Sequence, residues 1–252
     1  KNVVYNFRQN DLENGGQGAP LVPIFHNLLA NIIHKKFKIN FPLNILNIGG
    51  ISNITKTVSE IDLSKENIEA CDIGPGNVLI DEWVRYNSNK KIDLDGLIGK
   101  SGKINQLVLN QAIENFSNVS IEKSLDVKDF DISFAKGLSL EDGCATLTNF
   151  TAYLISEGIK LFNKKNENII SKYLICGGGR KNNFLLENIK GYLNDNNINI
   201  ELIDTYSING DYVESQAFAY LAIRSFLKLP ISFPGTTGCK KPCHGGVIVK
   251  NY

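Results

Sequence analysis

The 252 residues carry 27 basic and 26 acidic side chains, giving a net charge of +1, and 42% of the residues are hydrophobic. A chain of this length and composition can bury a substantial core, which excludes a disordered protein. The scattered, balanced charge disfavours a nucleic-acid partner, and no apolar run reaches the roughly 20 residues of a membrane span. Residues 1–5 are unlike a signal peptide, so we expect a cytoplasmic protein.

Sulfur-containing residues add two expectations. The chain has no methionine, so we expect either a fragment of a longer protein or a sequence that has lost its methionines. Its five cysteines form an odd set, which favours reduced thiols. Only Cys239 and Cys243 are close in sequence, and a metal site that they form with His244 is less favoured than a plain loop, because a second close pair is missing.

The first elements are a strand, a glycine-rich loop and a helix. Residues 3–7 alternate as in a strand, and Gly15-Gly16-Gln17-Gly18-Ala19-Pro20 predicts a loop. After Pro23 the spacing of apolar residues predicts a helix, through Phe25, Leu28, Leu29, Ile32 and Ile33. We expect His26 and His34 at the surface or boundary of this helix, with a catalytic role for either as the minor alternative.

Residues 43–55 predict a hairpin whose turn is Gly49-Gly50. The backbone N–H groups of this turn, with the side chains of Ser52 and Asn53, are suited to holding a phosphate. A purely structural hairpin is the alternative. Residues 56–69 are polar and predict a second hairpin or a solvated connection.

The sequence is organised around Cys71-Asp72-Ile73-Gly74-Pro75-Gly76-Asn77, which lies between a strand-like segment and a helical pattern. Its glycines permit a sharp turn or a close approach, and Pro75 fixes φ between them. The helix that follows is expected to direct its first N–H groups toward a bound anion, with Asp72 at the mouth of the turn. The alternative is a plain strand-to-helix turn in which Asp72 caps the helix.

The middle of the chain is predicted to be mainly helical. Residues 83–111 have a helical pattern that Asp93-Leu94-Asp95-Gly96 interrupts, and this motif begins like a calcium loop without the later ligands. Residues 117–143 are polar and predicted to be irregular. Residues 145–162 predict an amphipathic helix that packs on a sheet.

A third strand leads into Cys176-Gly177-Gly178-Gly179. Three consecutive glycines cost backbone entropy unless a ligand or another segment comes close, and a flat adenosine group would be such a ligand. A helix over 183–193, a strand over 198–203 and a helix over 214–226 follow. Glu214 lies in the first turn of the last helix, where stabilisation of the helix terminus is its default role. Residues 234–238 predict a loop, and 245–249 predict a final strand.

Strands followed by helices, with glycine turns at the strand ends, predict an α/β protein whose ligand lies across several loops. The dinucleotide-binding Gly-x-Gly-x-x-Gly after a first strand is missing, and so is a Walker loop. The ligand-binding loops are therefore of another type.

Five motifs, in this order, resemble those of the anhydro-N-acetylmuramic acid kinase family and span most of the chain. They are Gly15-Gly16-Gln17-Gly18-Ala19-Pro20-Leu21-Val22-Pro23, Leu46-Asn47-Ile48-Gly49-Gly50-Ile51-Ser52-Asn53, Asp72-Ile73-Gly74-Pro75-Gly76-Asn77, Cys176-Gly177-Gly178-Gly179 and Glu214-Ser215-Gln216-Ala217-Phe218-Ala219. The resemblance implies an actin-like ATPase (ribonuclease H-like) fold of the sugar-kinase type. In that reading, residues 1–38 end the first lobe and cross to the second, and residues 39–252 form the second lobe.

The same resemblance implies ATP-dependent phosphorylation of 1,6-anhydro-N-acetylmuramic acid with hydrolytic opening of its anhydro ring. The product is N-acetylmuramate 6-phosphate, formed during recycling of cell-wall murein. Asp72 resembles the catalytic base that activates the attacking water. The residues implied to face the sugar are Arg8, Gly18, Ala19, Pro20 and Glu214. Those implied to bind ATP with Mg²⁺ are Gly49, Gly50, Asn53, Gly74, Gly76, Asn77, Gly177, Gly178, Gly179 and Asn182, and none is assigned as a metal ligand.

The chain also departs from the family pattern. From the resemblance we expect that the first lobe with its phosphate loop is missing from these residues. Asn6-Phe7-Arg8 stands where the family usually has Asp-Phe-Arg, and Lys123-Ser124-Leu125-Asp126 stands in place of Lys-Ser-Thr-Gly. Three readings remain open: a kinase complete only with a separate amino-terminal lobe, a catalytically weak nucleotide-binding or interaction module of the same fold, and another actin-fold sugar kinase. Folds of this type often pair, so a homodimer is a further expected partner state.

Overall fold

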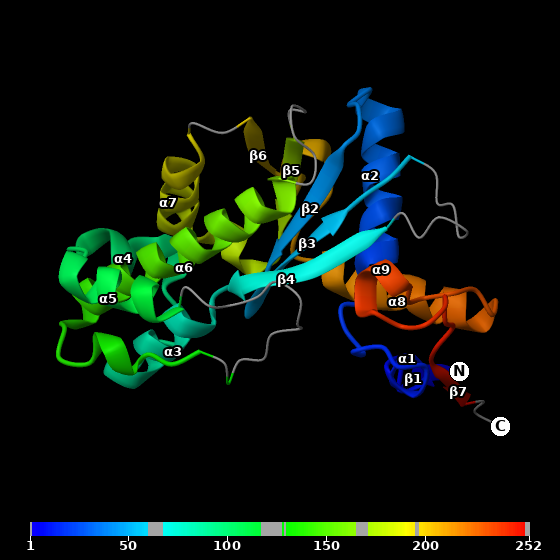
Figure 1. Cartoon of the computed structure of the whole chain (residues 1–252), viewed down its shortest axis with the longest axis horizontal. Helices are drawn as coiled ribbons and strands as arrows, with labels where there is room; N and C mark the ends of the chain where they lie inside the picture. Colours follow the sequence, from blue (N-terminus) through cyan, green and yellow to red (C-terminus); the bar gives the residue numbers. More distant parts are fainter. Residues whose placement is uncertain are drawn as a thin grey trace.

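A five-stranded mixed sheet forms the centre of the molecule (Figure 1). The computed structural model describes residues 2–59, 68–116, 128, 130–164, 171–194 and 197–249. Across the sheet, the strands are β4 (Glu69–Pro75), β3 (Ile51–Lys56), β2 (Leu43–Ile48), β5 (Ser171–Cys176) and β6 (Ile198–Leu202). The predicted connection after residue 56 lies mostly outside the described residues, as does Lys123-Ser124-Leu125-Asp126.

Strand direction identifies the fold class. β3 is antiparallel to both of its neighbours, β2 and β4, whereas β5 is parallel to β2 and β6 is parallel to β5. The sheet of an actin-like ATPase lobe has this arrangement. Three antiparallel strands, here β2, β3 and β4, lie on one side, and two further parallel strands, here β5 and β6, extend the sheet beside β2. The predicted α/β class and this fold are confirmed.

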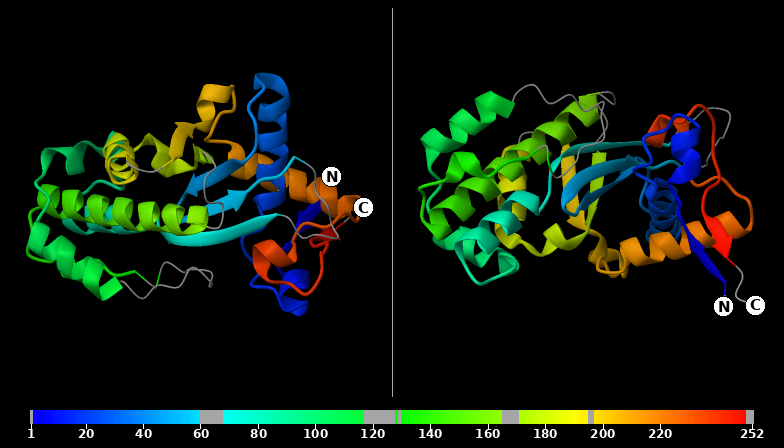
Figure 2. Two further views of the ribbon diagram at one scale, coloured as in Figure 1. Left: turned by 45° about the horizontal axis from the view of Figure 1, so that its top comes forward. Right: turned by 90° about the horizontal axis from the view of Figure 1, so that it is seen from below.

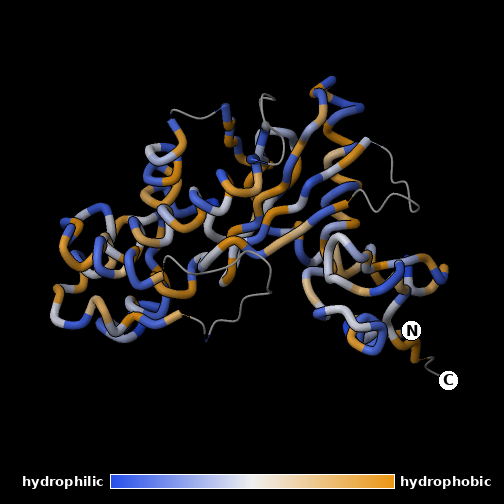
Figure 3. Tube along the Cα trace, in the orientation of Figure 1, coloured by the Kyte–Doolittle hydropathy of each residue, from blue (hydrophilic) through white to orange (hydrophobic). Residues whose placement is uncertain are grey.

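Helices cover both faces of the sheet (Figure 1). On one face, α6 (Leu140–Lys164) and α7 (Asn183–Leu193) bury Ile155 and Ile189 against strand residues such as Ile54. On the other face, α2 (Pro23–Phe37) and α8 (Val213–Phe226) bury side chains such as Phe25 against Ile45. Figure 3 shows hydrophobic stretches along the central strands, which these helices enclose.

A second helical cluster surrounds the first half of α6, beyond the end of the sheet (Figures 1 and 2). It contains α3 (Val78–Asn87), α4 (Leu97–Ser101) and α5 (Gln106–Phe116). Trp83 is buried in this cluster, and its indole Nε1–H donates to the Leu140 carbonyl at 2.9 Å. Short 3-10 helices complete the chain, at Leu94–Gly96, Ser133–Ala135, Gly178–Lys181 and Ile203–Tyr206.

Helix α6 begins at Leu140, inside the stretch predicted to be irregular. The Ser139 hydroxyl accepts the Asp142 N–H at 3.0 Å, which satisfies one of the free donors of the first turn. The prediction that the helix starts at residue 145 was therefore wrong by about one turn, because this serine cap was not recognised.

The first and last described segments lie side by side (Figure 2). β1 (Val3–Tyr5) pairs with β7 (Val247–Val249) in an antiparallel ribbon, and α1 (Gln9–Glu13) follows β1. The predicted loop at 234–238 is in fact the short helix α9 (Pro234–Thr237). Pro234 supplies a preset φ at its start, the Phe233 N–H donates to Thr236 Oγ1 at 3.1 Å, and Gly238 ends it with φ of 72°.

None of the helices in the described part of the chain combines the length and the apolarity needed to cross a membrane.

Close packing of α6 against α3 predicts a stability difference between two helical glycines. A Cβ at Gly143 would overlap the Trp83 indole, whereas a Cβ at Gly191 on α7 would meet nothing within 4 Å. We expect Gly143→Ala to lower the free energy of unfolding by about 1–3 kcal/mol through overpacking. Gly191→Ala, the control, should raise it by at most about 1 kcal/mol. Urea unfolding of both variants checks this, and equal effects would contradict the packing.

Candidate functional site

Four polar or thiol side chains form a row across the sheet on the face that α2 covers. Asp72 on β4 is paired with Asn53 on β3, Asn53 with Asn47 on β2, and Asn47 with Cys176 on β5. Paired residues on neighbouring strands point to the same face. The Cys176 thiol donates to Asn47 Oδ1 at 3.6 Å, which joins the two members at the β5 end of the row. The predicted base thus lies beside the Asn53 carboxamide on the adjoining strand, with that of Asn47 one strand farther.

Two of the predicted glycine turns are joined by backbone hydrogen bonds. The Gly76 N–H donates to the Gly50 carbonyl at 2.7 Å, and the Asn77 N–H donates to the Gly49 carbonyl at 2.8 Å. A Cβ at position 76 would overlap the Gly49 carbonyl, so this approach requires glycine. The hairpin turn and the turn before α3 therefore form one continuous loop structure.

The third turn meets the other two. Gly177 has φ of 83°, and a Cβ there would lie 2.5 Å from Asn47 Oδ1. A Cβ at Gly178 would lie 3.7 Å from Nδ2 of Asn77. The turns at Gly49–Gly50, at 74–77 and at 177–179 consequently lie together at one edge of the sheet. Gly50 and Gly178, which are exposed, leave this edge open.

The structure corrects how these turns present their polar groups. Three N–H groups at the start of α3, those of Gly76, Asn77 and Val78, donate to carbonyls of the hairpin turn. These three N–H groups are occupied and do not face an anion, whereas for the next N–H groups of α3, those of Leu79 and Ile80, the expectation stays a prediction. Ser52 is buried, and its hydroxyl donates to the Pro75 carbonyl at 3.1 Å, which makes it a structural residue of the turn. The alternative that Asp72 caps α3 is also wrong, because Asn77 occupies the cap position.

Asn182 lies behind the third turn. It is buried, and its side-chain Oδ1 accepts the Leu185 N–H at 2.9 Å, which caps α7. A Cβ at Gly96 would overlap this Oδ1, so the 3-10 helix at Leu94–Gly96 packs closely on the cap. The observed role of Asn182 is to start α7 and to fix the end of the glycine turn.

The predicted sugar-facing loop is held by a buried carboxylate that sequence reasoning did not single out. Asp11 is 1% exposed, and its two oxygens accept the Gly18 N–H at 2.7 Å and the Thr237 hydroxyl at 2.6 Å. Arg8 lies nearby and is exposed, with its Cβ 3.5 Å from the Cβ position of Gly18. Helix α9, which carries Thr237, packs against β4. The segment with Ala19 and Pro20 is thereby connected to the strand that bears Asp72.

Glu214 is exposed in the first turn of α8, as predicted, and lies near the row. Burial raises the pKa of the Cys176 thiol to about 12; the Arg180 guanidinium lowers it, and the carboxylates of Asp204 and Glu214 raise it further. Cys176 therefore stays a neutral thiol between the glycine turn and α8.

His26 is the clearest correction on α2. It is buried rather than at the surface, and its Nδ1 lies 2.8 Å from Thr55 Oγ1 on β3. Burial lowers its pKa to about 3, so the ring is neutral and joins the helix to the sheet. His34 is half-buried, as predicted for a boundary residue, with Nδ1 2.7 Å from the Ile39 carbonyl oxygen.

The two weak metal motifs take structural roles. The thiols of Cys239 and Cys243 both donate to the Lys241 carbonyl, and burial raises the pKa of Cys243 to about 11, which disfavours the thiolate that a metal needs. The Asp93 carboxylate accepts N–H groups of Ile98 and Gly99 at 2.7 and 3.0 Å, which caps α4. Within the described ranges, no group of three metal-binding side chains gathers.

Comparison with known families adds the decisive observation. The family described as "Anhydro-N-acetylmuramic acid kinase" matches residues 1–251. The chain belongs to the anhydro-N-acetylmuramic acid kinase family. An anhydro-N-acetylmuramic acid kinase of Pelagibacter ubique (strain HTCC1062) is 54% identical over 254 residues, covering 100% of the chain and 66% of that relative. One of Zymomonas mobilis is 38% identical over 247 residues, covering 98% and 63%.

The chain thus spans about two thirds of the length of the curated members of the kinase family that it matches. Among solved structures, it is similar to the activator of the 2-hydroxyisocaproyl-CoA dehydratase from Clostridium difficile with bound ADPNP, at 13% identity and a TM-score of 0.40 over 78% of this chain and 69% of that one. It is also similar to component A of the Acidaminococcus fermentans (R)-2-hydroxyglutaryl-CoA dehydratase, at 18% identity and a TM-score of 0.41 over 76% and 69%.

The residues that sequence reasoning missed had only weak signals. Asn47 interrupts an apolar strand, and Arg180 follows three glycines. Asp11 lies four residues before Gly15, the first residue of the glycine loop. Each becomes informative only when the register and the long-range hydrogen bonds are known. Asp81 on α3 also gave no clear signal in the sequence. Burial raises its pKa to about 6; the charge of Arg85 lowers this pKa and the charge of Asp93 raises it.

The buried imidazole predicts a pH dependence. Since the pKa of His26 is lowered from its ordinary value near 6.5 to about 3, the unfolded chain binds a proton more readily than the folded one. Between pH 6.5 and pH 3, His26 should therefore lower the free energy of unfolding by about 1.4 kcal/mol for each unit by which the pH decreases. Urea unfolding of the wild type and His26→Gln over this range measures it; parallel pH profiles would contradict the prediction.

The Asp11 carboxylate predicts a second effect, on the glycine loop. Asp11→Asn replaces one acceptor by a donor facing Gly18 or Thr237, so we expect a loss of about 1–3 kcal/mol in the free energy of unfolding. Hydrogen exchange at the Gly18 amide should become faster. Glu13→Gln on the same helix, where the side chain is exposed, should change stability by less than about 0.5 kcal/mol. Similar losses of stability in both variants would refute the role of the Asp11 carboxylate in holding the glycine loop.

Proposed function

We propose that this chain supplies the second lobe of a kinase that phosphorylates 1,6-anhydro-N-acetylmuramic acid with ATP and Mg²⁺. The reaction opens the anhydro ring by hydrolysis and gives N-acetylmuramate 6-phosphate for cell-wall murein recycling. The observation that carries the proposal is the meeting of three glycine turns beside Asp72, in a chain that belongs to this kinase family. Phosphoryl transfer depends mainly on positioning and charge stabilisation, which converging loops supply.

In the proposed reaction, the Asp72 carboxylate takes a proton from a water molecule whose oxygen attacks the anomeric carbon. The bond between that carbon and the 6-oxygen breaks, and the 6-oxygen attacks the γ-phosphorus as ADP leaves. A carboxylate within the polar row is suited to act as this base. Asn53 and Asn47 then orient the reacting groups beside it.

The nucleotide is proposed to lie over the open edge at Gly50, where Gly49, Gly74, Gly76 and Asn77 shape the turns beneath it. The turn at Gly177, Gly178 and Gly179, with the Asn182 cap behind it, would lie against the adenosine. Asn53 Oδ1 is buried and has no hydrogen-bond partner within the described part of the chain, so it is available to a bound group. Oxygen donors of this kind fit Mg²⁺, whose charge would offset that of the phosphates.

The sugar is proposed to lie between β4 and the loop that Asp11 holds. Arg8, Gly18, Ala19 and Pro20 would approach it from one side, and Glu214 from the start of α8. The packing of α9 on β4 supports this arrangement, because it brings the loop next to the strand of Asp72.

We also propose that residues 1–38 end the first lobe and cross to the second lobe at 39–252, with β7 returning to pair with β1. The side chains on one face of this ribbon are exposed, Val3 at 58% and Val249 at 48%, and a two-stranded ribbon is only marginally stable by itself. A neighbouring first lobe, present as a separate chain or in cis, would cover it. Because ATP is a cytoplasmic metabolite, the site of action proposed is the cytoplasm.

Loss of the base predicts loss of turnover. We expect ADP release from ATP, Mg²⁺ and 1,6-anhydro-N-acetylmuramic acid to fall at least about 1,000-fold in Asp72→Asn, since a neutral amide accepts no proton from water. The matched control is Asp95→Asn, whose exposed side chain lies at a positive φ that asparagine tolerates. A coupled assay of ADP formation measures both variants.

The assay is run on this chain alone and with the amino-terminal part of the Pelagibacter ubique relative added as a separate chain. Turnover lost only in Asp72→Asn supports the kinase and the base together. Nucleotide binding without turnover in both mixtures would favour a binding module of the same fold. Turnover with other sugars at higher kcat/KM would favour another actin-fold sugar kinase.

A further inference from the structure

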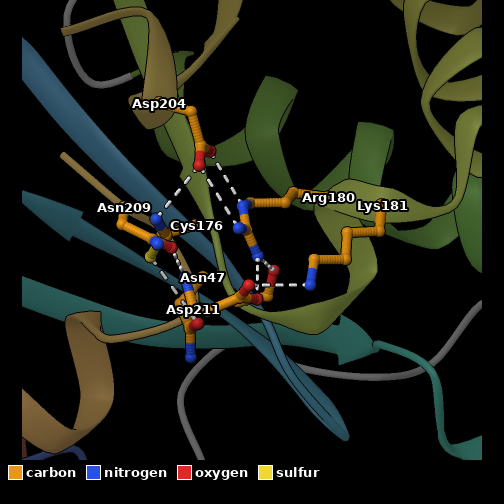
Figure 4. Close-up of polar contacts among 9 residues, drawn as sticks. Asn47, Cys176, Arg180, Lys181, Asp204, Asn209 and Asp211 are labelled. Carbon is orange, nitrogen blue, oxygen red and sulfur yellow. Dashed lines mark hydrogen bonds and ion pairs between the residues drawn. The ribbon is translucent and has the colours of Figure 1, made fainter. Parts of the chain in front are cut away.

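Arg180 is a buried cation directly after the third glycine turn. Its side chain is 6% exposed, and its guanidinium forms hydrogen bonds to three different residues (Figure 4). Nε and Nη2 donate to the two oxygens of Asp204 at 2.8 and 3.3 Å. Nη1 donates to Asp211 Oδ1 at 2.9 Å and to the Gly177 carbonyl at 3.1 Å. Arg180 is therefore bound both to its own turn and to the segment that precedes α8.

The segment at 204–211 is shaped around this guanidinium. A Cβ at Gly210 would overlap Arg180 Nε, and the Gly210 N–H donates to Asp204 Oδ1 at 3.2 Å. The exposed Lys181 adds an ion pair to Asp211 at 2.8 Å. The segment then enters α8, where Glu214 lies three residues after Asp211. The guanidinium is thus bonded to the residues that directly precede α8.

The charges of these four side chains balance. Arg180 and Lys181 are the two cations, and Asp204 and Asp211 are the two carboxylates. Hydrogen bonds from Arg180 lower the pKa of both Asp204 and Asp211, so both carboxylates are ionised at neutral pH. A planar guanidinium can bind one carboxylate with two nitrogens while a third nitrogen bonds elsewhere. Lysine has a single nitrogen and cannot hold the same three partners in this geometry.

We propose that Arg180 is a positioning residue that sets the nucleotide-side turn and the sugar-side helix terminus relative to each other. It acts through the Gly177 carbonyl on one side and through Asp204 and Asp211 on the other. Cys176, whose surroundings include Arg180, Asp204 and Glu214, lies between the two sides. This inference rests on the proposed function, in which the Gly177–Gly179 turn binds nucleotide and Glu214 faces the sugar.

Kinetics of Arg180→Lys provide the first test, in the same mixture of chains used for the turnover assay. We expect kcat/KM to fall about 10–100-fold, with higher KM values for both ATP and the sugar, because both sides lose their alignment. Lys181→Gln, which loses only an exposed ion pair, should remain within about twofold of the wild type. A change in only one of the two KM values, or equal effects in the two variants, would overturn the proposal.

A double-mutant cycle separates positioning from a general loss of structure. Glu214→Gln and Arg180→Lys should affect the sugar KM non-additively, by at least about fivefold, if Arg180 acts through the α8 terminus. Unfolding transitions of the variants, measured in urea, show whether each is folded under assay conditions. Additive effects in folded variants would contradict coupling between these positions.

Absence of turnover in the wild type would refute the proposed function but not the link made by Arg180. Hydrogen exchange tests that link independently of turnover. In Arg180→Lys, amides of the Gly177–Gly179 turn and of residues 209–216 should exchange faster together, while those of α6 keep the wild-type rate. Arg180→Gln should show the same pattern and Lys181→Gln should not. Faster exchange in only one segment, or in neither, would show that Arg180 does not link the two.

Discussion

The approach of one backbone to another at Gly76 is the contact on which the rest of the site depends. Hydrogen bonds of 2.7 and 2.8 Å join the turn before α3 to the hairpin turn, and there is no room between them for a side chain. This contact sets the end of β4, and with it the position of Asp72 beside Asn53. It also occupies the N–H groups of Gly76, Asn77 and Val78, so these three are not available to a bound anion.

Two buried charged residues connect this edge to its surroundings. Asp11 joins the glycine loop near Arg8 to α9, which packs on β4, and Arg180 joins the third glycine turn to the segment before α8. In both cases an ionisable side chain is almost fully buried and forms hydrogen bonds to two or more different residues. A buried ionisable group is tolerated only when it is hydrogen-bonded or ion-paired, as Asp11 is by Gly18 and Thr237 and Arg180 is by Asp204 and Asp211, so these two positions restrict the loops around them strongly.

Local patterns predicted most elements because they depend on neighbouring residues. The apolar spacing after Pro23 corresponds to α2, and the Gly49-Gly50 turn lies between β2 and β3 as expected. The errors have a common cause in contacts that local patterns do not contain. His26 is buried because β3 places Thr55 against it, and Ser52 turns toward the Pro75 carbonyl because β4 pairs with β3. The serine cap of α6 and the short helix α9 were missed because their signals are brief.

The sequence by itself determined the α/β class, the order of most elements and the family, because glycine turns and apolar periodicity are written in consecutive residues. Only the tertiary structure decided which turns meet and which polar groups remain available. Strand register puts Asp72, Asn53 and Asn47 in one row, although Asp72 is 25 residues from Asn47 in the chain. Register and burial are set by packing between distant segments, and no local pattern records them.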